Sequence, residues 1–196
     1  MHWPVAFAKG KTSDGKPNLN LELTNDPLPT WRAMEKLVDS GKVKHIGISN
    51  FTPGRAKHIL DNARIKPVVN QVELNLYCAQ PDLLAWSKKN GIILEAYSPL
   101  GSTGAKCRED PTVVEIAKKH NVDPANVLIS WQVERGCIVL PKSVTPGRIK
   151  SNFQDVKLSK EDVEKLERAA KKDDRTVDPS KAWGYEVFKD SPSAKL

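Results

Sequence analysis

The chain has 196 residues, of which 39% are hydrophobic and 28% charged; these proportions are typical of soluble globular proteins and exclude a disordered or fibrous chain. No apolar run approaches the roughly 18 residues that a membrane-spanning helix needs. Lys and Arg total 31 against 24 Asp and Glu, so the net charge is +7. This excess leaves three kinds of anionic partner open: nucleic acid, a membrane surface or a phosphorylated cofactor.

The cysteines and the first residues bear on cellular location. Cys78, Cys107 and Cys137 are an odd number without CxxC or Cys/His spacing, which favours reduced thiols over a disulfide framework or a metal site. The opening residues MHWP lack the features of a secretory signal or a transit peptide. We therefore expect a cytoplasmic protein without a bound metal.

The first third of the chain changes from a polar to an amphipathic pattern. Residues 8–29 are rich in Lys, Gly, Asn, Asp, Thr and Pro, which predicts a long surface loop. Residues 30–41 then predict a helix that ends at Gly41. The apolar residues that share one face of this helix are Trp31, Met34, Leu37 and Val38.

From residue 43 onward, strand-like and helix-like segments alternate. The predicted strands are 43–49, 68–74, 92–97 and 137–140. The predicted helices are 52–63, 80–90, 111–120, 124–132, a short helix from Thr145, and 159–171, followed by an irregular tail over 172–196. Apolar strands alternating with helices are typical of a parallel sheet covered by crossover helices, an α/β fold. No linker divides the pattern, so we predict one domain over residues 1–196.

Polar or aromatic side chains stand at the end of each predicted strand. They are His2, Ser49, Asn50, Gln71, Tyr97, Ser98, Lys142 and Ser143. Because the carboxyl ends of parallel strands converge on one rim, we expect a ligand pocket there.

The segment 140–152, LPKSVTPGRIKSN, combines a strand end with the start of a basic helix. Thr145 and Pro146 begin a helix whose free N–H groups attract anions, Lys142 precedes it, and Arg148 lies in its first turn. These groups suit a phosphate dianion, and an Arg plane can also stack on a base. Composition alone leaves a solvated basic helix start as the alternative.

Four motifs in this order resemble the aldo-keto reductase family. They are IGISNF at 46–51, NQVE at 70–73, EAYSPLGS at 95–102, and PKS at 141–143 with Arg148 and Asn152. MHWP resembles the end of that family's fourth strand. Residues 97–102 and 183–189 are most similar to its fungal NADP-dependent glycerol dehydrogenase and aldehyde reductase members.

The resemblance implies a (β/α)8 (TIM) barrel that binds NADP(H) and reduces aldehydes or ketones, or oxidises a polyol such as glycerol in reverse. The implied cofactor residues are Ser49, Asn50 and Gln71 at the nicotinamide carboxamide, Tyr97 stacked on its ring, Ser98, Leu100 and Ser102 along the pyrophosphate, Lys142, Ser143 and Arg148 at the 2′-phosphate, and Asn152 at the adenine. His2 matches the catalytic histidine and Trp3 the wall of the substrate site.

Each of these residues also has an ordinary structural explanation. Ser49 and Asn50 can end a strand and cap a helix. Tyr97 and Trp3 can be packed aromatics, and His2 can be a frayed terminal residue. Gln71 is the least ordinary, because an amide buried in an apolar strand needs hydrogen-bond partners.

The resemblance also gives the chain length a meaning. A barrel of this kind typically has about 250 residues, and the family's catalytic Asp, Tyr and Lys come before the point at which this chain begins. We therefore expect the C-terminal half of the barrel, about strands 5–8, with a cofactor site but without those three residues. Exposed strand edges predict self-association. An inactive NADP-binding or interaction module, or a fragment without a function, are the alternatives.

The positive charge does not favour nucleic acid. Lys residues are interspersed with Asp and Glu, and the sequence has no nucleic-acid recognition motif. We expect a small carbonyl or polyol substrate, and neither nucleic acid nor membrane as a partner.

Overall fold

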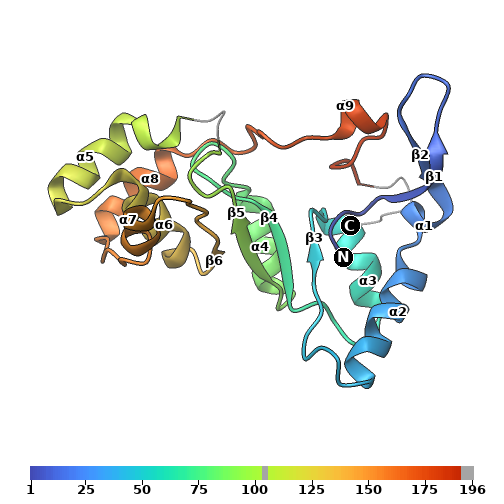
Figure 1. The fold of residues 1–196 in the computed structure, drawn as a ribbon. Coiled ribbons are helices and arrows are strands. Elements are labelled where there is room, and N and C mark those ends of the chain that lie inside the picture. Colours follow the sequence, from blue (N-terminus) through green and yellow to red (C-terminus); the bar gives the residue numbers. More distant parts are fainter. Residues whose placement is uncertain (103–105, 191–196) are drawn as a thin grey trace. The chain divides into compact units, whose positions relative to one another are not determined.

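The computed structural model of the chain describes residues 1–102 and 106–190 (Figure 1). It contains two compact units. The first unit comprises Met1–Gln71, Ala85–Ile92 and the chain from Asp178 onward, and the second comprises Val72–Leu84 and Ile93–Val177. The prediction of a single domain over the whole chain stays a prediction.

The first unit begins with a hairpin where we expected a loop. Strands β1 (Ala6–Lys11) and β2 (Pro17–Asn20) pair antiparallel and lead into the short helix α1 (Leu21–Asn25). The Gly15 amide donates to Thr12 O at 2.9 Å, and Gly15 has a φ of 81° that suits glycine. The prediction of a loop over 8–29 was wrong because most of β1 is exposed and needs no alternation of apolar residues.

The core of the first unit lies between helices and the short strand β3 (Ile48–Ser49). Helices α2 (Leu28–Asp39) and α3 (Pro53–Asn62) were both predicted. Trp31 of α2 is fully buried with Ile48 and Phe51, and its indole N–H donates to Ile65 O at 2.9 Å. Burying a side chain of this size contributes about 1.5–3 kcal/mol or more.

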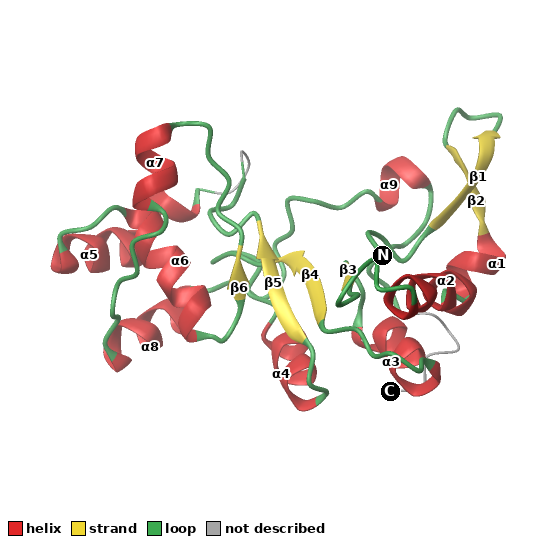
Figure 2. Ribbon diagram, turned by 60° about the horizontal axis from the view of Figure 1, so that its bottom comes forward, coloured by secondary structure: helices red, strands yellow, loops and turns green. Residues whose placement is uncertain are grey.

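Strand β4 (Val69–Glu73) contributes residues to both units and pairs parallel with β3, with Ile48 opposite Asn70. Gly47 permits the close approach of this pair, because a Cβ there would lie 2.6 Å from Val69 Cγ2. In the second unit, β5 (Ile93–Tyr97) pairs parallel with β6 (Ile138–Val139). The strand order is β3-β4-β5-β6 (Figure 2), which confirms the predicted parallel α/β pattern.

Helices of the second unit bury a second core. The α4 helix (Pro81–Lys89) belongs to both units, whereas the other helices of this part are α5 (Pro111–His120), α6 (Pro124–Glu134), α7 (Pro146–Ser151) and α8 (Lys160–Ala169), with a 3₁₀ turn, η1, at Cys107–Glu109. Trp131 and Leu166 are fully buried in this core. A capping box of Ser159 and Asp162 begins α8, which agrees with the predicted start of a helix at residue 159.

The predicted irregular tail is partly ordered by one buried carboxylate. Glu73, at the end of β4, has no exposed surface and accepts hydrogen bonds from the amides of Thr176 (3.1 Å) and Val177 (3.0 Å). Further along, the short helix α9 (Ser180–Trp183) belongs to the first unit. The prediction of an irregular tail over 172–196 therefore missed one helix.

Candidate functional site

The end of β3 brings three predicted residues of the first unit into contact. The Ser49 hydroxyl donates to the backbone oxygen of Gln71 at 2.8 Å, and the backbone N–H of Asn50 donates to the same oxygen at 2.9 Å. Ser49 and Asn50 are buried, whereas Gln71 is only half-buried, contrary to expectation, because its side chain leaves the strand on a less covered face. Ser49 and Asn50 thus meet at the backbone oxygen of Gln71, and the cofactor roles of the three side chains stay predictions.

Asn50 also fixes the chain that carries His2. Its side-chain Nδ2 donates to His2 O at 3.1 Å and lies 3.2 Å from Ser49 Oγ. Because Asn50 is 1% exposed, these contacts are shielded from water. Sequence reasoning assigned this amide to a ligand and missed its structural role, which depends on residues 48 positions apart.

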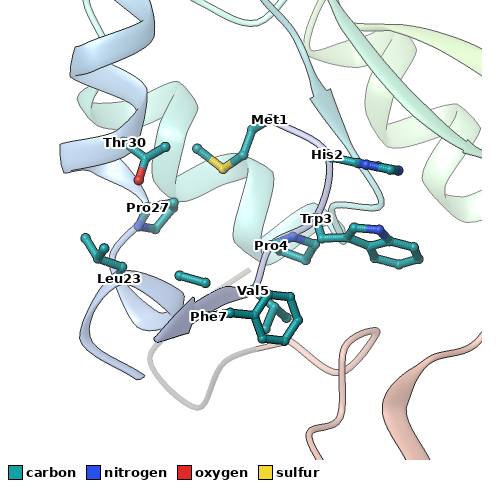
Figure 3. A pocket seen from close by; sticks show the side chains of 10 residues that line it. Met1, His2, Trp3, Pro4, Val5, Phe7, Leu23, Pro27 and Thr30 are labelled. Carbon is teal, nitrogen blue, oxygen red and sulfur yellow. The ribbon is translucent and has the colours of Figure 1, made fainter. Parts of the chain in front are cut away.

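His2 and Trp3 lie in an aromatic cluster. The exposed His2 ring stacks on Trp3 with centroids 5.7 Å apart, and Trp3 meets Trp183 edge-on at 5.1 Å and Phe188 at 6.2 Å. Figure 3 shows the His2 and Trp3 side chains extending away from Leu23 and Pro27. The His2 ring is therefore accessible and oriented by an aromatic neighbour rather than frayed.

A largely apolar cavity of about 350 Å³ lies beside this cluster in the first unit. Its lining is Met1, His2, Trp3, Pro4, Val5, Ala6, Phe7, Leu23, Pro27 and Thr30 (Figure 3). Its size is in the range of small-ligand sites.

In the second unit, the turn after β5 holds the next predicted residues in unusual backbone conformations. Ser98 and Ser102 have φ values of 51° and 53°, and the Gly101 amide donates to Ser98 O at 2.9 Å. Among the described residues, five non-glycine residues have positive φ, and three of them, Asn50, Ser98 and Ser102, are predicted site residues. Such conformations cost of order 1–3 kcal/mol and cluster at functional sites.

Tyr97, the last residue of β5, is half-buried, and burial raises its pKa above the ordinary value. Its carbonyl accepts from the Leu74 amide at 3.2 Å. A neutral phenol ring fixed at a strand end is suited to stacking on a flat ligand.

A small cavity of about 60 Å³ gathers the predicted phosphate-binding residues of the second unit. It is lined by Leu100, Lys142, Ser143, Arg148 and Asn152, all predicted, and by Arg108, Asp123, Ala125 and Ser151, which were not. The Arg148 guanidinium donates to Thr145 Oγ1 at 2.8 Å, and the Thr145 amide donates to Ser143 Oγ at 3.1 Å. Cationic, hydroxyl and amide groups around one cavity are the donors that a phosphate needs.

The scaffold behind this cavity depends on a residue that sequence reasoning missed. Asn126, 2% exposed in the first turn of α6, donates from Nδ2 to Ser151 O at 2.7 Å and to Gln154 O at 3.1 Å. These bonds attach the end of α7 to α6 and so position Arg148. The sequence signal for Asn126 is weak, because α6 also carries Ser130, Gln132 and Glu134 among its apolar residues.

Residues 1–102 and 106–190 contain neither a cluster of metal ligands nor a membrane-spanning helix. No group of three or more His, Cys, Asp or Glu side chains is placed there to hold a metal ion. No helix in this part of the chain is long and apolar enough to cross a membrane.

The parallel strands and helices define an α/β protein, and a cavity of its second unit is lined by Arg108, Lys142 and Arg148. The model of the aldo/keto reductase family matches residues 1–171. The chain belongs to this family, and the resemblance found in the motifs is confirmed.

Two relatives are glycerol 2-dehydrogenases (NADP(+)). The enzyme of Hypocrea jecorina is 44% identical over 96% of this chain and 63% of its own length, and that of Saccharomyces cerevisiae is 41% identical over 96% of this chain and 65% of its own. The chain thus spans less than two thirds of either relative.

Solved structures agree with this assignment. Aldose reductase from Schistosoma japonicum superposes with a TM-score of 0.84 at 34% identity, over 98% of this chain and 64% of that one. An aldo-keto reductase of Bombyx mori in complex with NADP gives a TM-score of 0.79 at 30% identity, over 96% of this chain and 61% of that one.

Proposed function

We propose that this chain binds NADP(H) and takes part in the NADP-dependent reduction of aldehydes or ketones, or in the reverse oxidation of a polyol such as glycerol. The names of the relatives support this class of substrate and cofactor. The observation that carries the proposal is the cavity shared by Lys142, Ser143, Arg148 and Asn152.

The donor set of this cavity fits the 2′-phosphate of NADP(H). Lys142 and Arg148 supply charge, Ser143 supplies a hydroxyl and Asn152 an amide. A charge-assisted contact contributes about 1.5–3 kcal/mol, which is enough to separate NADPH from NADH. Leu100 and the Ser98–Ser102 turn would continue the site along the pyrophosphate.

Each unit offers groups of its own for the nicotinamide part of the cofactor. Ser49, Asn50 and Gln71 offer hydrogen-bonding groups for its carboxamide, and Tyr97 offers a ring to stack on it. When bound, the reduced nicotinamide supplies a hydride to the substrate carbonyl carbon.

His2 would orient the carbonyl oxygen, and Trp3 would form a wall beside it. The imidazole N–H can donate a hydrogen bond to oxygen as negative charge develops there. Stacking on Trp3 restricts the ring to one plane. The neighbouring cavity of about 350 Å³ is large enough to admit a small carbonyl compound.

We further propose that the strand order β3 to β6 corresponds to the fifth to eighth strands of a (β/α)8 barrel, which forms the C-terminal half of that fold. The parallel register and the superposition on longer solved structures support this. We propose that a second copy of the chain is a partner, bound through exposed strand edges. We also propose a cytoplasmic location for the chain.

A cofactor-binding module without turnover is the second candidate. The environment of His2 favours this candidate. Its exposed ring stacks on Trp3, and no side chain among the described residues is hydrogen-bonded to it. A proton donor for the reduced carbonyl is required for catalysis.

Two measurements test these proposals. Titration of NADPH and NADH by fluorescence should give tighter binding of NADPH, and Arg148→Ala should weaken NADPH by about 10–100-fold and NADH by far less. Equal losses for the two cofactors would contradict the phosphate assignment. Turnover of glyceraldehyde with NADPH supports the reductase, whereas binding without turnover supports the module.

A further inference from the structure

We propose that Arg108 is an additional phosphate-binding residue of the second unit's cavity and that Asp123 opposes it, so that this pair sets the affinity for phosphorylated cofactor. The inference rests on the proposed function. Neither residue belongs to the motifs that define the resemblance, and both line the cavity with Lys142 and Arg148.

The charges at the cavity come from separate segments of the second unit. Arg108 lies in η1, Lys142 follows β6, Arg148 lies in α7, and Asp123 precedes α6. Three cations against one carboxylate leave an excess of two positive charges around the cavity. A phosphate monoester carries about −1.5 to −2 at pH 7, so Arg108 raises the charge of the site to match that of the ligand.

The backbone that carries Arg108 is fixed on both sides. Cys107 has no exposed surface, and its thiol donates to Asn75 Oδ1 at 3.6 Å. Asp110 caps α5 by accepting from the Thr112 amide at 2.9 Å, and the Tyr77 hydroxyl donates to its carboxylate at 3.1 Å. Only the side chain of Arg108 must therefore become ordered on binding, which lowers the entropic cost.

The guanidinium of Arg108 is exposed and forms no ion pair with another described residue. Lys106, two positions earlier, differs because its ammonium lies 3.6 Å from the Glu109 carboxylate and it is not part of the cavity lining. The two residues carry the same charge on the same turn. Lys106 is therefore a matched control for the position of the charge.

Asp123 also lines the cavity and caps α6 by accepting from the Ala125 amide at 2.8 Å. Asn is as good a helix cap as Asp. Asp123→Asn therefore keeps the cap and removes the negative charge from the cavity.

A stacking role on the adenine base would be a different use of the same guanidinium. Stacking affects NADPH and NADH equally, because both carry the base. A phosphate contact affects NADPH alone, because only NADPH carries the 2′-phosphate. The ratio of the two affinities therefore distinguishes the roles.

The experiment measures dissociation constants of the full chain for NADPH and NADH by fluorescence titration. We expect Arg108→Ala to weaken NADPH about tenfold and NADH less than about twofold. We expect Arg108→Lys to keep most of the preference, Lys106→Ala to change neither affinity by more than about twofold, and Asp123→Asn to tighten NADPH severalfold.

Equal losses of NADPH and NADH in Arg108→Ala, or an NADPH loss matched by Lys106→Ala, would overturn the inference. Arg148→Ala, measured in parallel, keeps the two proposals apart. If Arg148→Ala selectively weakens NADPH and Arg108→Ala does not, only the inference about Arg108 fails. If the unmodified chain shows no preference for NADPH, the proposed function fails and the inference fails with it.

Discussion

The two units present their candidate site residues in opposite ways. In the first unit, the polar groups of Ser49 and Asn50 are buried and bonded to the protein itself, at Gln71 O and His2 O. In the second unit, Lys142 and Arg148 are exposed, and the buried polar group is the supporting amide of Asn126. Among these candidate residues and their supports, neutral groups hold the backbone in both units, and the exposed cations lie in the second unit.

This difference has an energetic consequence. A buried hydrogen-bonding group that loses its partner costs about 1–3 kcal/mol, whereas an exposed side chain usually changes stability by less than about 0.5 kcal/mol. Variants of Ser49 and Asn50 in the first unit should therefore destabilise the fold. Variants of the exposed cations should change binding alone.

The largest effect is expected for Asn50→Ala. It leaves His2 O and Ser49 Oγ without this donor and places Ala at a φ of 65°. We expect the free energy of unfolding to fall by about 2–4 kcal/mol, measured by urea denaturation. Asn50→Gly is the control, because it relieves the backbone strain but not the lost hydrogen bonds. Recovery of full stability in Asn50→Gly would contradict the role given to the amide.

Next in size is Asn126→Ala, which tests the scaffold of the second unit. Loss of the bonds to Ser151 O and Gln154 O should lower the free energy of unfolding by about 1–3 kcal/mol. Because α7 carries Arg148, NADPH affinity should fall as well. Calorimetry of unfolding and fluorescence titration of NADPH check the two effects. A stability loss with unchanged affinity would show that α7 keeps its position without Asn126.

Local signals predicted the fold well where caps and periodicity agree. The predicted helix 111–120 matches α5 at both ends, with Asp110 as its cap and the left-handed Asn121 after it. The hairpin of β1 and β2 was missed because its exposed faces carry no apolar alternation. The strand predicted over 43–49 covers only Ile48–Ser49 in the structure. Its extent depends on pairing with β4, which is a tertiary property that no local pattern encodes.

In the candidate site too, local sequence signals indicated some residues, whereas others are brought there only by the fold. Lys142 and Arg148 were predicted because their charges lie close together in sequence beside a helix start. Arg108, Asp123 and Asn126 reach the same cavity or its wall from other segments, so only the folded chain brings them there. The sequence therefore indicated two of the cations that line the cavity, Lys142 and Arg148, but not Arg108, Asp123 or Asn126, and the binding role of Lys142 and Arg148 stays a prediction.

A smaller effect on the free energy of unfolding is expected when Asp162, in the second unit, loses its charge. This effect depends on pH. Burial favours its neutral form, but hydrogen bonds from Lys119 (2.8 Å), His120 (2.9 Å) and Ser159 outweigh burial and hold its pKa below the ordinary value. A lowered folded-state pKa stabilises the fold above the ordinary pKa of about 3.9, and this contribution is lost as pH falls through the folded-state value.

Asp162→Asn should therefore cost about 1–2 kcal/mol at pH 7 and progressively less in acid. The measurement is the urea midpoint of both proteins at pH 7 and at pH 3. A constant difference between them would show that the charge of Asp162 does not stabilise α8. The first unit provides the comparison, since Asp26 has its pKa lowered chiefly by His58 but is exposed and should contribute little.

The smallest effect on stability is expected for Arg148→Ala, and it is the sharpest test of the contrast between the units. The side chain is exposed, and its hydrogen bond to Thr145 Oγ1 competes with water. We expect the free energy of unfolding to change by less than about 0.5 kcal/mol in the same urea assay, while NADPH affinity falls. A loss above about 1 kcal/mol would place Arg148 among the groups that hold α7 together. The exposed charges of the second unit would then be part of its scaffold, as the buried amides of the first unit are.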